Sequence, residues 1–416
     1  MRWDTQHIVY GMDITFIAND TRGGVEPYIA LAREAASRGH RVNAAAPADY
    51  QVQFVAAGVR FTPLRGADRE AITAVGGRVS IHEMGRLVSV LAQDWALDTA
   101  ELARGSHVIV SGIGGMGLAR PVAAATGAAV LRAHLQPLEA PSTEYPGPLA
   151  PGLDRRGPIG RRVSHSITAA GTRLLLRTPE RVARTALGVK GSPEVVLPEI
   201  LYGFSSAVVP VRSDAHTRRL ATGYWTLSSN GSVPDPLLSE FLDAPGPVVS
   251  IGFGSMQTDD GPALRRIVDE AVRRVGVRAV LLTGWGALAG GIDQDERVFS
   301  TPSVPHDWLF PRMSANVHHG GAGTTGAAIG AGVPTVIVPF GADQPFWAQR
   351  AHRLGVAPKP IPRRRLTAAN LAGALEQALS DADMITRARE LGALLGQETG
   401  VRTAVDEIES AVERRR

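Results

Sequence analysis

Residues 318–325 read HHGGAGTT and combine more structural signals than any other part of the chain. An apolar segment precedes them, and a run of small residues typical of a helix follows. Glycines here let the backbone approach a ligand closely, and Thr324 and Thr325 fall where a helix N-cap is expected. A helix N-terminus offers unpaired N–H groups and the positive end of the helix dipole. The stretch therefore predicts a strand, a phosphate-binding turn and a helix.

Further polar residues gather around this turn. His319 adds a hydrogen-bond donor beside the predicted phosphate site. Downstream, a turn and the apolar strand 335–338 lead to Asp343 and Gln344. Ligands of α/β sheets bind outside the carboxyl ends of the strands. A phosphate site, a histidine and a carboxylate–amide pair that can bind hydroxyls together suit a sugar diphosphate.

Two other glycine runs follow predicted strands. Residues 252–255 read GFGS, where small residues would admit a phosphate and Ser255 could donate to it; a tight turn with a capping serine is the alternative. Residues 112–117 read GIGGMG and fit the dinucleotide pattern GxGxxG. That pattern also needs an acidic residue about 20 positions on, and the next strand instead leads to His134. We interpret the second run as a glycine-rich loop facing a cleft, not as an NAD site.

The spacing of apolar strands predicts an α/β protein with two doubly wound, Rossmann-like domains facing across a cleft. Strands alternate with helices before residue 134 and again after residue 247, as in parallel βαβ units. Residues 136–159 predict a long loop, 161–186 a pair of helices, and 381–413 a helical stretch returning to the first domain. The expected divisions are a 1–12 extension, a 13–215 first domain, a 216–245 linker, a 246–395 second domain and a 396–416 C-terminal helix.

Several motifs resemble those of family 1 glycosyltransferases, the UDP-glycosyltransferase-like enzymes with a GT-B fold. The run from VPHDWLFP at 304–311 to DQPFW at 343–347 is most similar to the branch of sterol glucosyltransferases and antibiotic-glycosylating enzymes. TRGGVEPY at 21–28, TGYW at 222–225 and SIGFGSM at 250–256 agree in order. The resemblance covers residues 12–395; across 65–198 it is only architectural.

The resemblance implies a first domain that binds an acceptor and a second that binds a UDP- or TDP-sugar. Transfer would be a single inverting displacement onto a hydroxyl of a small molecule, such as a natural product of secondary metabolism or antibiotic biosynthesis. Each implied role falls on particular residues: Ser255, His319, Gly321, Gly323, Thr324 and Thr325 at the diphosphate, Asp343 and Gln344 at the sugar, and Val304 at the base. Ser303 stands where relatives stack an aromatic on the base, so Trp285 is the candidate replacement; His318 would be buried support.

The catalytic base is where the chain departs from the family. The first loop of this branch usually reads GSRGD, and its aspartate is the presumed base. Residues 20–24 here read DTRGG, so Gly24 replaces the aspartate and Asp20 stands at the family's glycine. Asp20 could be a relocated base, or another cleft residue such as His134 or Asp94 could serve. Otherwise the acceptor needs little deprotonation, or the chain is inactive.

Two other functions remain open at this stage. A nucleotide-sugar epimerase of GT-B architecture would bind the donor without an acceptor. A donor-binding protein without activity would explain the missing aspartate. Gly24 could also be glycine because its backbone needs a positive φ.

Composition narrows the chemistry. The chain has no cysteine and no HExxH, so we expect no cofactor and no metal, with His319 and the helix dipole facing the diphosphate charge. The net charge of +4 comes with arginine clusters that could contact nucleic acid or anionic membrane, but solvated surface is our interpretation. No apolar run reaches the ~18–20 residues of a membrane span, and residues 1–11 lack a signal-peptide core. We expect a cytoplasmic monomer or homodimer, without stable membrane insertion or nucleic-acid binding.

Overall fold

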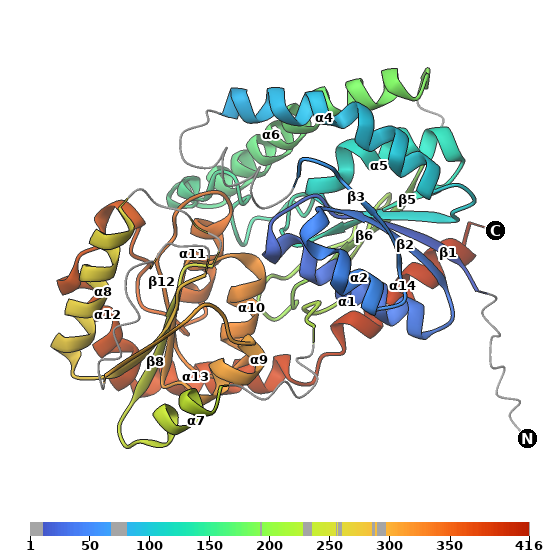
Figure 1. Cartoon of the computed structure of the whole chain (residues 1–416). Coiled ribbons are helices and arrows are strands. Elements are labelled where there is room, and N and C mark those ends of the chain that lie inside the picture. The colour runs from blue at the N-terminus through green and yellow to red at the C-terminus, as the bar shows by residue number, and fades with distance from the viewer. Residues whose placement is uncertain are drawn as a thin grey trace, which may run out of the picture.

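The computed structural model describes residues 11–67, 81–191, 194–227, 235–254, 256, 260–284, 288 and 297–415, with the side chains of 81–89 left out. This part of the chain forms two α/β domains, each built on a parallel sheet (Figure 1). The fold class predicted from the sequence is thereby confirmed.

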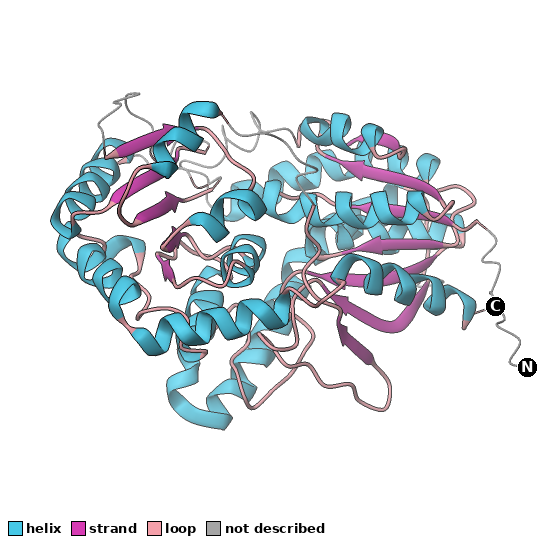
Figure 2. Cartoon of the chain, turned by 90° about the horizontal axis from the view of Figure 1, so that it is seen from below, coloured by secondary structure: helices cyan, strands magenta, loops and turns pink. Residues whose placement is uncertain are grey.

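The first domain contains a seven-stranded parallel sheet in the order β3-β2-β1-β4-β5-β6-β7. Its strands are β1 Asp13–Ile17, β2 Arg41–Ala46, β3 Arg60–Pro63, β4 Val108–Ser111, β5 Ala129–His134, β6 Val195–Tyr202 and β7 Arg218–Ala221. Its helices are α1 Arg22–Ser37, α2 Gln51–Ala56, α4 Ile81–Leu102, α5 Ile113–Thr126 and α6 Gly157–Ala186. Every residue of β4 is buried, because helices cover both faces of the sheet (Figure 2).

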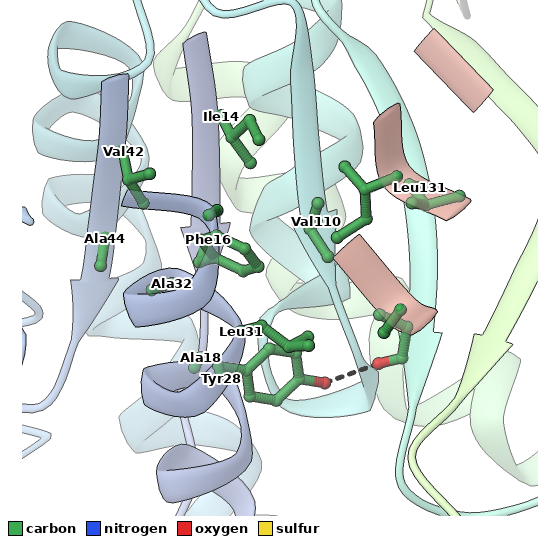
Figure 3. Packing of buried hydrophobic residues seen from close by; sticks show 14 of the residues in the cluster. Ile14, Phe16, Ala18, Tyr28, Leu31, Ala32, Val42, Ala44, Val110 and Leu131 are labelled. Atoms are coloured by element: carbon green, nitrogen blue, oxygen red, sulfur yellow. Dashed lines mark hydrogen bonds between the residues drawn. The ribbon is translucent and has the colours of Figure 1, made fainter. Parts of the chain in front are cut away.

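One hydrophobic core of this domain lies between the sheet and α1. Phe16 of β1 packs there with Leu31 and Tyr28 of α1 (Figure 3). The Tyr28 hydroxyl donates a 2.6 Å hydrogen bond to the carbonyl of Ala133 at the end of β5. A second core on the other face joins the sheet to α4, α5 and α6.

The second domain contains a five-stranded parallel sheet in the order β10-β9-β8-β11-β12. Its strands are β8 Val248–Gly252, β9 Arg278–Leu282, β10 Val298–Thr301, β11 Ala315–His318 and β12 Thr335–Ile337. Its helices are α7 Pro236–Asp243, α8 Gly261–Val275, α9 His306–Leu309, α10 Ala322–Gly330, α11 Gln344–Arg353, α12 Ala368–Ser380 and α13 Ala382–Leu395. The strand β11 pairs with both β8 and β12, so their carboxyl ends lie side by side.

The chain returns to the first domain through α14 Gly400–Glu413. Val405 and Ile408 of this helix are fully buried in the same core as β1 and α1. His40 binds Glu409 at 2.8 Å, which fixes the helix against the end of α1. The predicted return of the C-terminal segment therefore agrees with the structure.

Aromatic packing also joins the two domains. Tyr145 packs edge-on against Phe346 with ring centroids 6.0 Å apart, and Phe204 packs against Trp347 at 5.7 Å. Asp154 forms ion pairs with Arg161 of its own domain and with Arg353 of α11. These contacts connect the two domains directly.

Two segments differ from the sequence prediction. Residues 161–186 are not a helix pair: they belong to the single helix α6, which follows a short 3-10 turn at Pro151–Arg156 inside the predicted loop. The strand β7 lies within the predicted 216–245 linker and pairs with β6, so the first domain extends further than expected. In the described part of the chain, no helix is both long enough and apolar enough to span a bilayer.

Candidate active site

A cavity opens at the carboxyl ends of β1, β4 and β5, on the side of the first domain that faces the second. Asp20, Gly24 and Tyr28 line it from the β1–α1 segment. The first turn of α5 and Gln136 line it from the other strands. This position follows from parallel pairing, which brings the carboxyl ends of neighbouring strands to one edge.

Asp20 is the acidic side chain of this cavity. Its carboxylate accepts hydrogen bonds from the Thr21 N–H at 2.6 Å and the Thr21 hydroxyl at 3.3 Å. Burial raises the pKa of Asp20 to about 6; the Thr21 hydrogen bonds oppose the rise, and the charge of Asp343 adds to it. The carboxyl group is therefore mostly ionised at neutral pH while remaining a stronger base than an ordinary aspartate.

Gly24 explains how Asp20 fits. A Cβ added at Gly24 would lie 2.5 Å from the Asp20 Cβ and would overlap its carboxyl group. The φ of Gly24 is not positive, so a special backbone conformation is not what requires glycine. A side chain at position 24 and the Asp20 carboxylate in its present place exclude each other.

The glycine run at 112–117 is the start of α5, not the loop that we expected. Gly112 is the N-cap, and Gly114 and Gly115 lie in the first turn. Side chains at these positions would overlap the backbone carbonyls of Asn19 and Ile17. The run therefore lets α5 pack closely against the end of β1 and also lines the cavity.

The other proposed bases lie elsewhere. Asp94 is exposed on α4, in the outer helical layer, so the suggestion that it is a cleft residue was wrong. His134 is buried and its Nε2 binds Glu139 at 3.0 Å, with Arg132 on the same carboxylate at 2.7 Å. Burial acts to raise the pKa of Glu139, but His134 and Arg132 outweigh it and lower this pKa to about 2. His134 does not line the cavity, although the next two residues do.

On the second domain, the side chains of His318 and His319 are oriented differently at the end of β11. His318 is buried, and its Nδ1 accepts a 3.0 Å hydrogen bond from the Gly320 N–H, which agrees with a supporting role. Side chains at the flanking glycines would meet the His319 ring: a Cβ at Gly254 would lie 2.9 Å from it and a Cβ at Gly321 2.5 Å. His319 thus fills the space between the β8 loop and the start of α10.

We expected His319 to help offset the negative charge of a bound diphosphate, but its ring is uncharged in the free protein. Burial lowers the pKa of His319 to about 4, so the ring is neutral at pH 7 in the free protein. Its Nδ1 is buried and has no hydrogen-bond partner in the described structure. The neutral ring can donate one N–H bond to an anion, and a bound diphosphate would raise its pKa.

The helix α10 begins at Ala322, earlier than a predicted N-cap at Thr324 or Thr325 implies. Gly321 is the N-cap, so Thr324 and Thr325 lie in the first turn and the N-cap assignment was wrong. The hydroxyl of Thr325 is buried without a partner. Gly323 lies across from Gly23 of the first domain: a Cβ added to it would be 3.9 Å from the Gly23 carbonyl oxygen. The phosphate-type turn and the Asp20 loop therefore face each other.

Asp343 and Gln344 lie at the start of α11, after the loop that follows β12. Asp343 accepts a 2.9 Å hydrogen bond from the Trp347 indole and one from Gln136 of the first domain. Burial raises the pKa of Asp343. The side-chain carbonyl of Gln344 accepts a 2.8 Å hydrogen bond from the Phe340 N–H, so this amide also stabilises the loop that precedes α11. Asp343 thus lies close to Asp20 across the cleft.

The remaining predicted donor residues are less informative. Val304 is buried just before α9. Ser255 and Trp285 lie outside the described residues, so their proposed contacts stay predictions. The described residues contain no group of three or more His, Cys, Asp or Glu arranged to hold a metal ion.

Sequence reasoning missed three residues at this site. Gln136 follows β5 directly, and its place at a strand end was the available signal. His306 stacks on Phe310 with centroids 4.3 Å apart. Burial and the nearby charges of Arg22 and His319 lower the pKa of His306 to about 4. Arg22 thus reaches the second domain from the start of α1, a proximity that no sequence pattern reveals.

Comparison with known proteins shows which sequences and structures this chain resembles. Residues 293–401 match the model of the Erythromycin biosynthesis protein CIII-like C-terminal domain. The chain is 31% identical over 425 residues to the sterol 3-beta-glucosyltransferase of Debaryomyces hansenii, covering 95% of this chain and 26% of that protein. It is 32% identical to that of Emericella nidulans, covering 95% and 30%. The chain therefore spans about a third or less of the length of these curated relatives.

Solved structures show the same fold. The glycosyltransferase SnogD from Streptomyces nogalater superposes with a TM-score of 0.69 at 18% identity, covering 97% of this chain and 100% of that one. The calicheamicin glycosyltransferase CalG4 gives 0.68 at 19%, covering 97% and 99%. The glycosyltransferase VinC, solved in complex with DTDP, gives 0.65 at 19%, covering 97% and 100%.

Proposed function

The chain belongs to the family 1 glycosyltransferases of GT-B architecture, and on that premise we propose that it transfers a sugar from a UDP- or TDP-sugar to a hydroxyl group of a small molecule. The observation that carries this proposal is the placement of Asp20 on the first domain opposite Asp343 and the start of α10 on the second. The proposed base and the proposed leaving-group site would thus face each other across one cleft.

The leaving diphosphate would bind at the start of α10. The first turn of this helix presents N–H groups that have no partner within the helix, together with the positive end of its dipole. His319 would donate one further hydrogen bond from its neutral ring. The unpartnered Thr325 hydroxyl supports the same location, because a buried hydroxyl without a partner is costly unless a ligand completes it. Gly321, Gly323 and Thr324 complete this site.

The sugar would lie between the diphosphate and the first domain. Asp343 would accept hydrogen bonds from sugar hydroxyls, and the Gln344 amide nitrogen would donate to them. That nitrogen donates a 3.3 Å hydrogen bond to the sulfur of Met256, a weak acceptor that a hydroxyl would replace. Ser255, Trp285 and Val304 are the proposed contacts to the α-phosphate and the base.

Asp20 is our proposed catalytic base. The acceptor hydroxyl would approach the anomeric carbon from the face opposite the diphosphate, and Asp20 would take its proton as the new bond forms. The C1–O bond to the diphosphate breaks with its electron pair leaving on the phosphate oxygen, so the configuration inverts. A carboxylate with a pKa of about 6 is ionised at neutral pH and still basic enough for this transfer.

We place the acceptor among natural-product alcohols, the class that includes sterols. The names of the relatives, sterol 3-beta-glucosyltransferases, favour an apolar polycyclic alcohol. The matched family model, named for erythromycin biosynthesis, favours a natural-product alcohol more broadly. No metal or cofactor takes part in the proposed reaction.

The test is a matrix of nucleotide sugars against candidate acceptors, read by mass spectrometry. We expect a glycosylated product and nucleoside diphosphate in equal amounts, and donor consumption only when an acceptor is present. Conversion of the donor into an isomer without acceptor would instead identify an epimerase. Donor binding by calorimetry with no turnover of any donor would identify a binding protein.

A further inference from the structure

The outward face of α6 carries a row of exposed apolar side chains. Ile159, Val163, Ile167 and Leu174 follow one another at helical spacings, so they share one side of this 30-residue helix. Ile159 is 76% exposed and Leu174 71%. The opposite side packs against the first domain through residues such as Thr168. Helices of globular proteins ordinarily keep such an apolar row for the core.

Arginines accompany this row. Arg162 and Arg173 lie along one side of it, and Arg177 and Arg181 continue it toward the end of the helix. All four are exposed, and none forms an ion pair with any described residue. The single acidic residue of α6, Glu180, is bound to Arg184. The face therefore combines apolar surface with positive charge that nothing in the described structure balances.

The row begins near the opening between the two domains. Just before α6, Asp154 bridges Arg161 and Arg353 of the second domain. The 136–150 loop connects this end of α6 to Gln136 in the cavity, and its exposed Leu149 hydrogen-bonds Thr168 through its N–H. Figure 1 shows α6 along the outer edge of the first domain, beside α4.

We propose that this face of α6 docks the protein peripherally on a lipid bilayer that contains anionic headgroups. The apolar side chains would enter the boundary between headgroups and acyl chains, and the arginine guanidinium groups would bind lipid phosphates. Peripheral docking would hold the cleft where an apolar acceptor partitions.

Charge and area argue against other occupants. A row of about 16 residues at about 1.5 Å each and a helix about 10 Å wide offers roughly 250 Å², well below the ~800 Å² per partner of a stable protein interface. In a two-fold contact between copies, the same arginines would also face each other. The helix has no Phe, Trp or Tyr, so base stacking by a single-stranded nucleic acid has no partner.

Co-sedimentation with phosphatidylcholine vesicles, with and without phosphatidylglycerol, tests the proposal. We expect clear binding only to the anionic vesicles, weakened by salt. Arg173→Gln with Arg177→Gln should weaken it about 30-fold, and Ile167→Gln with Leu174→Gln should also weaken it. Val52→Gln with Val55→Gln, on exposed positions of α2, is the matched control and should bind as wild type.

Several results would overturn the docking surface. These are equal binding of all variants, equal binding to neutral and anionic vesicles, or no vesicle binding. Light scattering that shows a wild-type dimer lost in the α6 variants would mean that the face covers a second copy instead. Thermal unfolding of each variant checks the fold. The inference is independent of the proposed transfer reaction, because vesicle binding is measured without donor or acceptor.

Discussion

An exchange of side chains between positions 20 and 24 would test the proposed base most directly. Asp20→Asn keeps the size of the side chain but removes the base, so turnover should fall about 10²-fold or more, or about 2.7 kcal/mol of transition-state stabilisation. Gly24→Ala should have a similar effect for a steric reason, because its Cβ would overlap the Asp20 carboxyl group and displace it.

The exchange itself should restore activity. Asp20→Gly frees the space beside position 24, and Gly24→Asp then brings a carboxylate into nearly the same volume. The double variant should recover much of the turnover, whereas Gly24→Asp alone should not, since two carboxylates compete for one space. The two positions should therefore be strongly non-additive, with a coupling energy of about 1–3 kcal/mol.

The pKa of Asp20 adds a pH dependence. In the free enzyme, kcat/KM should fall about tenfold per pH unit below pH 6, because Asp20 becomes protonated. The free energy of unfolding should change with pH in the opposite direction to kcat/KM. The pKa is raised from 3.8 to about 6 on folding, so the stability that protonated Asp20 contributes at low pH is lost as the pH rises from about 4 to about 6, and it changes no further above that. Asp20→Asn should then be more stable than wild type at pH 7 by about 1–2 kcal/mol after discounting for partial exposure, and this advantage should vanish below pH 4.

Steady-state turnover with an identified donor and acceptor, together with thermal unfolding at pH 4 and 7, would measure these effects. Nucleoside-diphosphate affinity of each variant is the control, because Asp20 lies on the opposite domain from the diphosphate site. Wild-type turnover in Asp20→Asn would refute the base assignment. Full activity in Gly24→Ala would refute the conclusion that a side chain at position 24 and the Asp20 carboxylate exclude each other.

Three further predictions concern the second domain. His319→Ala should weaken UDP or TDP binding by ~1.5–3 kcal/mol in calorimetry, the range for a hydrogen bond to a charged group, while His318→Ala should lower the melting temperature and leave affinity unchanged; equal affinity in wild type and His319→Ala would contradict the site. Activity should survive exhaustive chelation with EDTA, and a loss of more than tenfold that Mg²⁺ restores would show that a metal neutralises the diphosphate. Ala342 has a φ of 52°, so Ala342→Gly should raise the free energy of unfolding by about 0.5–1 kcal/mol in denaturant titrations, and a decrease would mean that the loop is unstrained.

Much of the fold was predictable because parallel strands buried on both faces read as continuous apolar runs. The strands β4, β8 and β11 are of this kind, and each was found in place. The edge strand β7 reads RRLA and is only partly buried, so its sequence resembles a linker. Only its pairing with β6 identifies it as a strand.

The helix α6 was misread for a related reason. Its glycines and prolines indicate helix breaks, yet the helix continues through Pro179. Gly160 lies where a Cβ would overlap the carbonyl of Leu153, so this glycine serves close packing and not a turn. Local propensity is a weak guide where tertiary contacts compensate for it.

The sequence by itself determined the two α/β domains, the phosphate-type turn before α10 and the Asp343–Gln344 pair, because glycine spacing and apolar runs act locally along the chain. It also showed that Asp20 and Gly24 exchange the family's residues. Only the tertiary structure decided that Asp20 fills the space above Gly24 and faces Asp343. The reason is physical. The propensity and the expected burial of each residue depend on its local sequence, whereas the approach of two carboxylates from different domains depends on how the two sheets are oriented across the cleft.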